Sequence, residues 1–556
     1  MYSMPGTRKK LKTVWITTLI INLLALFIGI AYLLSGIRSV FWNLYGIFIF
    51  AALAINIYVA YIEDPRKMRG YFYFIYSGLC MLLIPVLNSI ASFTPAHYDS
   101  ISKVSCALFL SLFAYGIMLS LSRLISRKTE AEILLDDFEL IRYRKEDRNR
   151  SLKTVLIILL SLVLALGCAV AYKILAIHVE FWILEAFIPS VSLFYAFVFL
   201  NTGVLIVKLL PDKKSLALKI VYSAVTLTVF VICLLPFASA PFMAGTAKME
   251  YISAFGEDYL TSSDYNFDQF RKYRFSIPEY FFGMETKGVA VSTDIPFYTG
   301  KGSADEGLQL YFDAYTPADD GDMLPGGYSV LVRIHGGGWT SGDKGFLNNA
   351  QVNRYFASQG YVVFDIQYGL NDIKGISKYA EEQYGDYTVD DMVRHIGIFL
   401  DYLAKHADEY KANIDSVFIS GGSAGGNLAL ATGLTLSDGK YGDFPGRRVK
   451  IKGIIPFYPA NKLADSFGIG ASLEFIDPGL IVSESSPPCL IFQGTHDGLV
   501  KYPVTLEFKN KYIAAGNPKC AVISAPFGGH ACDMYFPGYY NQLFLYYKER
   551  FMYQFR

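Results

Sequence analysis

Residues 417–426 read VFISGGSAGG, and this stretch decides the fold of the C-terminal half of the chain. The apolar residues at its start predict a strand, and the Ala-rich residues 424–436 predict a helix. Between them Gly421, Ser423 and Gly425 form the pattern Gly-x-Ser-x-Gly. Small neighbours allow a tight, strained turn that lifts the serine hydroxyl above a sheet, and the following helix directs its amides and positive dipole end at negative charge that develops there. The stretch therefore predicts a reactive serine between a strand and a helix.

Short β-rich runs alternate with helical stretches on both sides of this turn, which is typical of a mostly parallel sheet covered by helices. The sequence predicts eight strands, at 288–296, 308–315, 329–334, 361–366, 416–420, 452–457, 489–493 and 521–525. It predicts helices at 346–359, 389–410, 424–436, 504–515 and 539–551. Residues 288–556 are therefore expected to form one α/β domain with an eight-stranded, mostly parallel sheet.

A serine hydroxyl is a poor nucleophile until a base removes its proton, so the sequence must supply a histidine. His530 follows the last predicted strand, and Asp497 follows the seventh, which gives the chain order serine, acid, histidine that this strand and helix pattern favours. We expect Ser423, His530 and Asp497 to form a catalytic triad, with His496 as a neighbour without a catalytic role. The alternative for Asp497 is an aspartate that caps a turn at a strand end.

Donors for a developing oxyanion are expected from a second glycine segment, Gly336 to Gly338, which follows the third predicted strand. Glycines let backbone amides face a substrate closely, so we expect Gly336, Gly337 and the amide of Ala424 to form an oxyanion hole. His335 precedes these glycines. We favour a role in shaping the loop over a role as general base.

Four motifs resemble the hormone-sensitive-lipase-like and acetylesterase branch of the α/β-hydrolases, over about residues 290–556. They are HGGGW at 335–339, GGSAGG at 421–426, GTHDGLV at 494–500 and GGH at 528–530, in the order that the family shows. The resemblance implies an α/β-hydrolase fold and hydrolysis of carboxylic esters, commonly short-chain ones, with no metal and no organic cofactor. The sequence departs from the family at Gly422, where an acidic residue usually stands, at Tyr368-Gly369-Leu370, and in an acid motif without Asp-Pro-Leu.

The first 240 residues differ sharply in composition from the rest. They carry 23 Lys and Arg against 13 Asp and Glu, whereas the remaining residues carry 27 against 36. The basic residues lie in short loops between apolar runs and form no continuous stripe, which gives no support for nucleic-acid binding, so no nucleic-acid partner is expected. Seven runs reach the length of about 20 residues that a bilayer crossing needs, at 14–36, 40–62, 71–93, 104–125, 154–176, 181–207 and 217–239. Residues 1–245 are therefore predicted to form a helical membrane domain with seven crossings.

Orientation follows from the loops, because positive residues resist translocation. With the N-terminus in the cytoplasm, twenty Lys and Arg lie in cytoplasmic segments, and only Arg38, Lys103 and Lys173 lie in the opposite loops. Seven crossings then place the α/β domain outside the cytoplasm. The first run is expected to remain as an anchor, because it is too long for a signal peptide and lacks a cleavage site.

The sixth run contains Pro189 and Asn201, and we expect one tilted helix there because two crossings would need about forty residues. Glu185 is the only acidic residue well inside a run. Its position near one end favours an interfacial residue that pairs with a neighbour, and a contact to a proton or substrate is the functional alternative.

Residues 246–287 are rich in Tyr and Phe and are expected to be a cap over the site, a segment on the bilayer surface or a packed linker. The seven cysteines show no metal spacing. Cys489 and Cys520 could be joined only if their strands brought them within disulfide range.

The sequence leaves three functions open. The first is a membrane-anchored esterase or deacetylase that acts on a small-molecule, glycan or lipid ester. The second is an acyltransferase that passes an acyl group to a surface glycan or lipid. The third is a receptor or transport protein whose α/β domain only binds a ligand. The sequence makes no prediction of oligomeric state or of a task for seven helices beyond anchoring.

Overall fold

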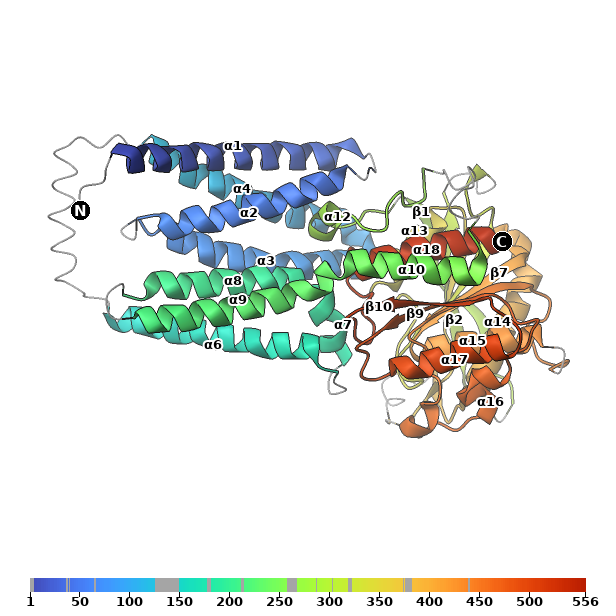
Figure 1. Ribbon diagram of the computed structural model, residues 1–556. Helices are drawn as coiled ribbons and strands as arrows, with labels where there is room; N and C mark the ends of the chain where they lie inside the picture. The colour runs from blue at the N-terminus through green and yellow to red at the C-terminus, as the bar shows by residue number, and fades with distance from the viewer. Residues whose placement is uncertain are drawn as a thin grey trace.

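The computed structural model joins a bundle of long helices to an α/β domain at one end of the bundle (Figure 1). It describes residues 5–556 except 37–38, 40, 65–66, 126–149, 178–181, 212–214, 258–267, 287, 303, 319–322, 374, 376–382 and 439–440. Several predicted features lie outside the described residues, among them most of the basic loop between Arg123 and Lys153 and the aromatic residues Tyr259, Tyr265 and Phe267.

Among the described residues, seven helical stretches are long and apolar enough to cross a membrane, which confirms the predicted multi-pass helical region. They are α1 (Pro5–Ser35), α2 (Trp42–Ile62), α3 (Arg69–Phe93), α4 (Tyr98–Leu124), α6 (Arg150–Leu175), α8 (Ser192–Leu209) and α9 (Leu216–Ala238), the last continuing as α10 (Ala240–Phe255). Many apolar side chains on the outer faces are exposed, such as Phe27 and Leu162, as expected for helices that face lipid. The N-terminal end of α1 and the α/β domain lie at opposite ends of the bundle (Figure 1).

The sixth apolar run makes one crossing, as expected, but it is broken into two helices, so the expectation of one continuous tilted helix is wrong. Helix α7 (Trp182–Ser190) ends before Val191, whose φ of −109° and ψ of 13° are not helical, and α8 begins at Ser192. Pro189 lies in the last turn of α7, where its missing N–H weakens the helical ladder. Only α8 is long enough to cross, and α7 lies between the bundle and the α/β domain (Figure 1).

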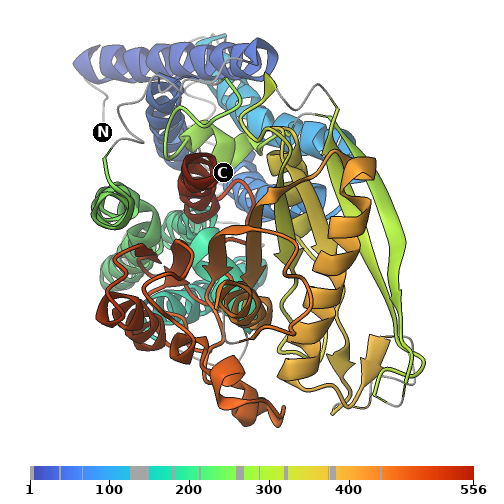
Figure 2. The same ribbon diagram turned by 90° about the vertical axis from the view of Figure 1, so that its right-hand side faces the viewer.

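The α/β domain is built on a single eight-stranded sheet, as predicted. Its strands are β1 (Val289–Thr299), β2 (Gln309–Pro317), β3 (Ser329–Ile334), β4 (Val362–Ile366), β7 (Asn413–Gly422), β8 (Ile451–Phe457), β9 (Cys489–Gly494) and β10 (Cys520–Ala525), in the order β1-β2-β4-β3-β7-β8-β9-β10. Strand β2 pairs antiparallel with β1 and with β4, and the remaining pairs are parallel. The β1–β2 pair forms one edge (Figure 2, yellow-green). A two-residue pair outside this sheet, β5 (Leu370–Asn371) with β6 (Tyr384–Gly385), has no counterpart among the predicted strands.

Side chains alternate between the two faces along each buried strand, and apolar residues stand on both faces. Helices therefore cover both faces of the sheet. On one face Val330, Val332 and Ile419 pack with α14 (Val389–His406), α15 (Ala424–Ser437) and α17 (Tyr502–Ala514). On the other face Leu331 and Phe418 pack with helices α13 (Asn349–Ala357) and α18 (Tyr539–Phe555). The short helix α16 (Leu473–Ile476) contacts α15. The second cluster continues without a break into the buried residues of the helical bundle, so the two parts of the chain share one core.

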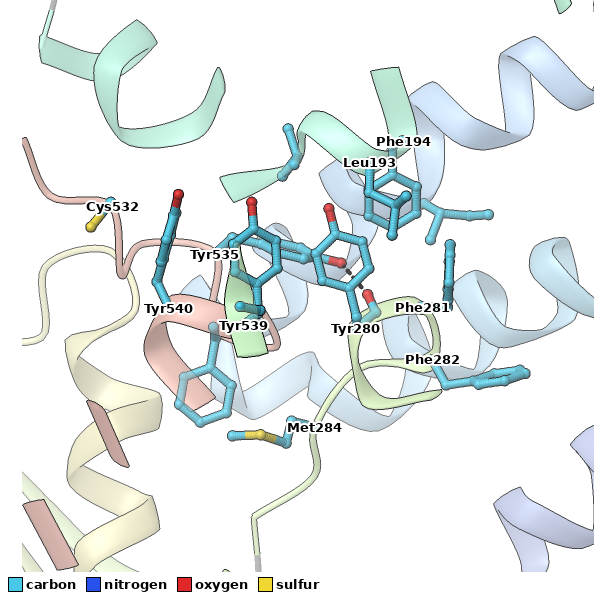
Figure 3. Packing of buried hydrophobic residues seen from close by; sticks show 14 of the residues in the cluster. Leu193, Phe194, Tyr280, Phe281, Phe282, Met284, Cys532, Tyr535, Tyr539 and Tyr540 are labelled. Atoms are coloured by element: carbon cyan, nitrogen blue, oxygen red, sulfur yellow. Dashed lines mark hydrogen bonds between the residues drawn. The ribbon is translucent and has the colours of Figure 1, made fainter. Parts of the chain in front are cut away.

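The described part of the aromatic segment joins these two parts as a packed linker. Helix α12 (Ile277–Phe282) contacts α2, α3 and α4, and its Tyr280, Phe281 and Phe282 are buried. Figure 3 shows Tyr280 beside Tyr535 and Tyr539 of the α/β domain, and the Tyr535 hydroxyl donates to the Tyr280 carbonyl oxygen at 2.7 Å. Buried aromatic pairs of this kind contribute about 0.5–1.5 kcal/mol each beyond the burial of their area.

Cys489 and Cys520 are opposite each other on the adjacent strands β9 and β10, and both thiols are buried and free. The strands therefore bring the two cysteines side by side.

Candidate active site

The serine turn has the strained geometry that the glycine pattern predicts. Strand β7 ends at Gly422, α15 begins at Ala424, and Ser423 between them has a φ of 56° and a ψ of −120°. A side chain at Gly421 would meet the carbonyl oxygen of Gly425 at 2.3 Å, and one at Gly425 would meet the carbonyl oxygen of Ile334 at 2.3 Å. Only glycine fits at these two positions, and a positive φ at a serine is a strain that functional sites retain.

Ser423, His530 and Asp497 form a continuous chain of hydrogen bonds, although they lie on three separate segments. The Nε2 atom of His530 is 3.0 Å from the Ser423 hydroxyl, and its Nδ1 atom is 2.9 Å from a carboxylate oxygen of Asp497. Asp497 follows β9 and His530 follows β10, so the carboxyl ends of neighbouring parallel strands bring them to the serine turn. This geometry lets the imidazole exchange a proton with the hydroxyl.

Asp497 is held in place by hydrogen bonds to both of its carboxylate oxygens. Its Oδ1 atom accepts from the backbone N–H groups of Leu499 and Val500 at 3.0 and 2.7 Å. Its Oδ2 atom accepts from the side-chain amide of Gln493 at 3.0 Å as well as contacting His530. The N–H contacts are those of an aspartate that caps a turn, which was the alternative for Asp497. The same carboxylate also contacts His530, so Asp497 caps the turn and is placed to orient the histidine.

Opposing effects act on the basicity of His530, which is buried. Burial is the largest single effect and disfavours the charged imidazolium, but the charge and hydrogen bond of Asp497 together with the charges of Glu185 and Asp533 outweigh it. The pKa of His530 is therefore raised above its ordinary value.

The glycine loop after β3 lies directly against the serine turn. An added side chain at Gly336 would meet the Gly422 carbonyl oxygen at 2.8 Å and the Ser423 Cβ atom at 3.4 Å. Gly337 has a φ of 124°, a conformation that favours glycine. Ala424 is the first residue of α15. Of the three positions expected to supply oxyanion donors, Gly336 and Ala424 thus adjoin the serine, and Gly337 lines the same cavity as Ser423.

The other two histidines near the site make contacts that do not involve the serine hydroxyl. His335 is buried, its Nδ1 atom is 2.8 Å from the Gly336 carbonyl oxygen, and its ring stacks on Tyr368 with 4.4 Å between centroids. These contacts agree with the role in shaping the loop. The His496 ring contacts Thr495 and Phe527.

A cavity of about 350 Å³ opens beside Ser423 and His530, within the size range of small-molecule sites. Its walls are largely apolar and include Trp339, Phe467 and Leu463. The residues that line it all belong to the α/β domain, so the described part of the aromatic segment forms no cap. Among the described residues, no group of three or more His, Cys, Asp or Glu side chains is placed to hold a metal ion.

Tyr458 occupies the space next to Gly422, where the resembling family usually has an acidic residue. A side chain at Gly422 would meet the Tyr458 ring at 3.2 Å. The Tyr458 hydroxyl donates to Asp533 at 2.9 Å, and its ring lies edge-on to His530 with 4.8 Å between centroids. An acidic side chain therefore still adjoins the site, supplied by the segment that carries the histidine.

The sequence predicts an interfacial position for Glu185, but in the structure this residue contacts the segments that carry Asp497 and His530. Glu185 of α7 accepts hydrogen bonds from the backbone N–H groups of Gly498 and His530 at 3.1 and 3.4 Å. Glu185 does pair with neighbours, as expected, but these neighbours belong to the α/β domain, about 300 residues away in the chain. The rarity of an acidic residue inside an apolar run was the signal that could have pointed to this contact.

Comparisons with known proteins find similarity over part of this chain. Residues 312–471 match the model of the family BD-FAE. The chain is 23% identical over 233 residues to the Mycobacterium tuberculosis protein named "Probable carboxylic ester hydrolase LipM", covering 38% of this chain and 51% of that protein. It is 31% identical over 115 residues to the acetyl esterase of Salmonella schwarzengrund, covering 20% of this chain and 31% of that protein. The chain thus spans about half the length, or less, of the curated relatives it matches.

A solved structure, Thermogutta terrifontis esterase 2 phosphorylated by paraoxon, is 24% identical with a TM-score of 0.35, covering 44% of this chain and 85% of that one. The family match includes the strands that carry the glycine loop and the serine turn, while the helical bundle has no counterpart in it. Over residues 312–471 the chain is therefore similar to the family BD-FAE, and part of the chain is similar to curated esterases.

Proposed function

We propose that this protein is a membrane-anchored serine hydrolase that cleaves carboxylic esters on the extracytoplasmic side of the membrane. The chain of hydrogen bonds from Asp497 through His530 to Ser423, next to a glycine loop and a cavity, is the observation that carries the proposal. A binding-only domain would not need this set of groups, so the arrangement favours catalysis over a receptor role.

The reaction follows from the positions of these groups. His530 accepts the proton of the Ser423 hydroxyl as its oxygen attacks the ester carbonyl carbon, and Asp497 stabilises the resulting imidazolium. The amides of Gly336, Gly337 and Ala424 hold the negative oxygen of the tetrahedral intermediate. The intermediate collapses to an acyl-enzyme, and His530 gives the proton to the departing alcohol. Water, activated by the same imidazole, then releases the acid and restores the serine.

The cavity favours a modest acyl group. Trp339, Phe467 and Leu463 offer an apolar surface, and a volume of about 350 Å³ suits a small molecule better than a long chain. We therefore propose a short-chain ester, such as an acetyl ester of a small molecule, a glycan or a lipid headgroup, as the substrate class.

Ester cleavage by the full-length protein in detergent tests this proposal. A short-chain chromogenic ester should be hydrolysed by the wild type, and Ser423→Ala should lower kcat by about 10³-fold or more. Ser437→Ala is the matched control and should keep full activity, because the Ser437 hydroxyl donates to the Gly433 carbonyl oxygen at the far end of the same helix. Equal turnover in wild type and Ser423→Ala would reject the proposal.

The orientation is proposed from the charge pattern and the bundle geometry. The bundle end far from the α/β domain is the end that carries Arg69, Arg123 and Lys208, and basic residues concentrate on the cytoplasmic side. A membrane-impermeant thiol reagent should label Met323→Cys, an exposed position of the α/β domain, in intact cells. It should label Ile125→Cys, at the opposite bundle end, only after permeabilisation. The reverse pattern would place the α/β domain in the cytoplasm.

A further inference from the structure

The segments that carry the proposed catalytic groups contact the helical part of the chain. This part, from α1 to the end of α10 at Phe255, is called the helical module below. Helix α7 is anchored to the segment that follows β10, because the Ser190 hydroxyl donates to the Cys532 carbonyl oxygen at 2.7 Å. The Tyr539 hydroxyl donates to the Pro189 carbonyl oxygen at 2.6 Å. Both bonds join α7 to residues that follow His530 in the chain, and they hold the helix against this segment.

Glu185 lies one turn earlier on α7 and contacts two segments at once. Its Oε2 atom accepts from the N–H of Gly498, the residue after Asp497, and from the N–H of His530 itself. One carboxylate oxygen thus links the segment that carries the acid to the segment that carries the base.

The backbone of the histidine segment is shaped for this contact. A side chain at Gly529 would meet both the Cβ atom and the carbonyl oxygen of Glu185 at 2.7 Å. Glycine therefore permits α7 to approach the residue immediately before His530, and a larger residue would push the helix and the segment apart.

We infer that Glu185 is a positioning residue, through which the helical module holds Asp497 and His530 at their distances from Ser423. The inference rests on the proposed hydrolase function. Glu185 does not line the cavity beside Ser423, so its influence acts through the two segments and not through substrate contacts.

The charge of Glu185 also belongs to the electrostatic surroundings of the base. The acidic groups that face His530 are Asp497 from the β9 side, Glu185 from α7 and Asp533 from its own segment, with the Tyr458 ring on a further side. Lys173 and His496 line a small cavity together with Glu185. Since the negative charge of Glu185 favours the protonated imidazole, its removal lowers the pKa of His530.

Two substitutions separate the roles of shape and charge. Glu185→Gln keeps an acceptor oxygen but removes the charge, so kcat at its plateau should stay within about threefold of wild type while the acid limb of the pH profile moves down by roughly half a pH unit. Glu185→Ala removes the acceptor, so kcat should fall at least about tenfold with KM unchanged, because misplaced catalytic groups slow the reaction without altering substrate binding.

Glu250→Gln is the matched control. The Glu250 carboxylate on α10 forms an ion pair with Lys509 of α17 at 2.6 Å. This ion pair also joins the helical module to the α/β domain, but Lys509 lies on a helix that carries neither Asp497 nor His530. Glu250→Gln should leave kcat, KM and the acid limb unchanged. A second variant, Gly529→Ala, should reproduce the loss of kcat at constant KM by displacing α7.

The assays use the full-length protein in detergent, with thermal unfolding and gel filtration to show that each variant is folded. A wild type that cleaves no ester would refute the proposed function, and this inference with it. If the wild type is active and both Glu185→Gln and Glu185→Ala have the same kcat and the same acid limb as the wild type, this inference is refuted while the proposed function stands. If Glu185→Ala fails to fold, the acid limb of Glu185→Gln decides, and an unshifted limb overturns the inference.

Discussion

At the scale of single residues, the two bonds made by His530 dominate the chemistry. Its Nδ1 atom contacts Asp497, so Nε2 is the atom that faces Ser423. The bonds that Asp497 accepts from Gln493, Leu499 and Val500 hold its carboxylate in the orientation that contacts His530. Asp497 therefore has the contacts that an orienting acid requires.

Removal of that charge gives the first prediction at this scale. Asp497→Asn should lower kcat by about 10³-fold to 10⁴-fold, because an amide stabilises the wrong histidine tautomer and does not stabilise the imidazolium. Steady-state kinetics on the full-length protein measure the effect, with unchanged thermal unfolding as the control. A loss of less than tenfold would show that Asp497 does not orient the base.

The pH dependence is the second prediction. The base must be neutral to accept the serine proton, so activity is lost as pH falls through the pKa of His530. The neighbouring carboxylates raise that pKa. The midpoint of the acid limb of kcat/KM should therefore lie above about 6.5, which is the pKa of an unperturbed imidazole. A kcat/KM profile measured between about pH 5 and 9 tests this, and a midpoint below the unperturbed value would contradict the assigned surroundings.

At the scale of elements, strands and turns are close to what the sequence predicts. The period and the flanking glycines locate the β7–Ser423–α15 unit within a few residues, since local sequence dictates a strand, a tight turn and a helix there. The break in the sixth apolar run was harder to predict from the sequence, because a proline in an apolar run is compatible with either a kinked helix or two separate helices. Packing of α7 against the α/β domain favours the break.

The glycines of the serine turn provide the prediction at this scale. Gly425→Ala should destabilise the fold by about 1–3 kcal/mol or more and abolish activity, since its Cβ atom would overlap the Ile334 carbonyl oxygen. Gly245→Ala on α10 is the matched control, because nothing lies within 4 Å of its added Cβ atom. That substitution should stabilise the helix by about 0.5–1 kcal/mol. Thermal unfolding distinguishes the two, and equal effects would contradict the packing described.

At the scale of the whole molecule, the shared core is the feature that sequence patterns could not reveal. Apolar runs predict crossings and alternating runs predict a sheet, but neither predicts that α12 and α18 bury aromatic side chains between the two parts. The contact of Glu185 with the segments that carry Asp497 and His530 could not be predicted from sequence patterns either. It depends on the packing of residues that are about 300 positions apart, which local pattern does not specify.

The shared core also predicts how the α/β domain behaves alone. A chain of residues 288–556 would expose Tyr535 and Tyr539, which are buried in the whole protein, where their rings contact Phe194 and Phe237 of the helical module. An apolar patch of that kind favours aggregation, so this fragment should be insoluble or aggregated when expressed without residues 1–287. Gel filtration measures the outcome, and a soluble, monodisperse and active fragment would show that the α/β domain does not need the module.

The identity of the nucleophile is the claim on which the whole account depends. Reaction of the full-length protein with a fluorophosphonate, followed by mass spectrometry of the digested chain, tests it most directly. The account predicts one covalent adduct, on Ser423, that forms slowly or not at all in His530→Ala. A protein that stays unlabelled while folded, or an adduct on a different residue, would contradict it.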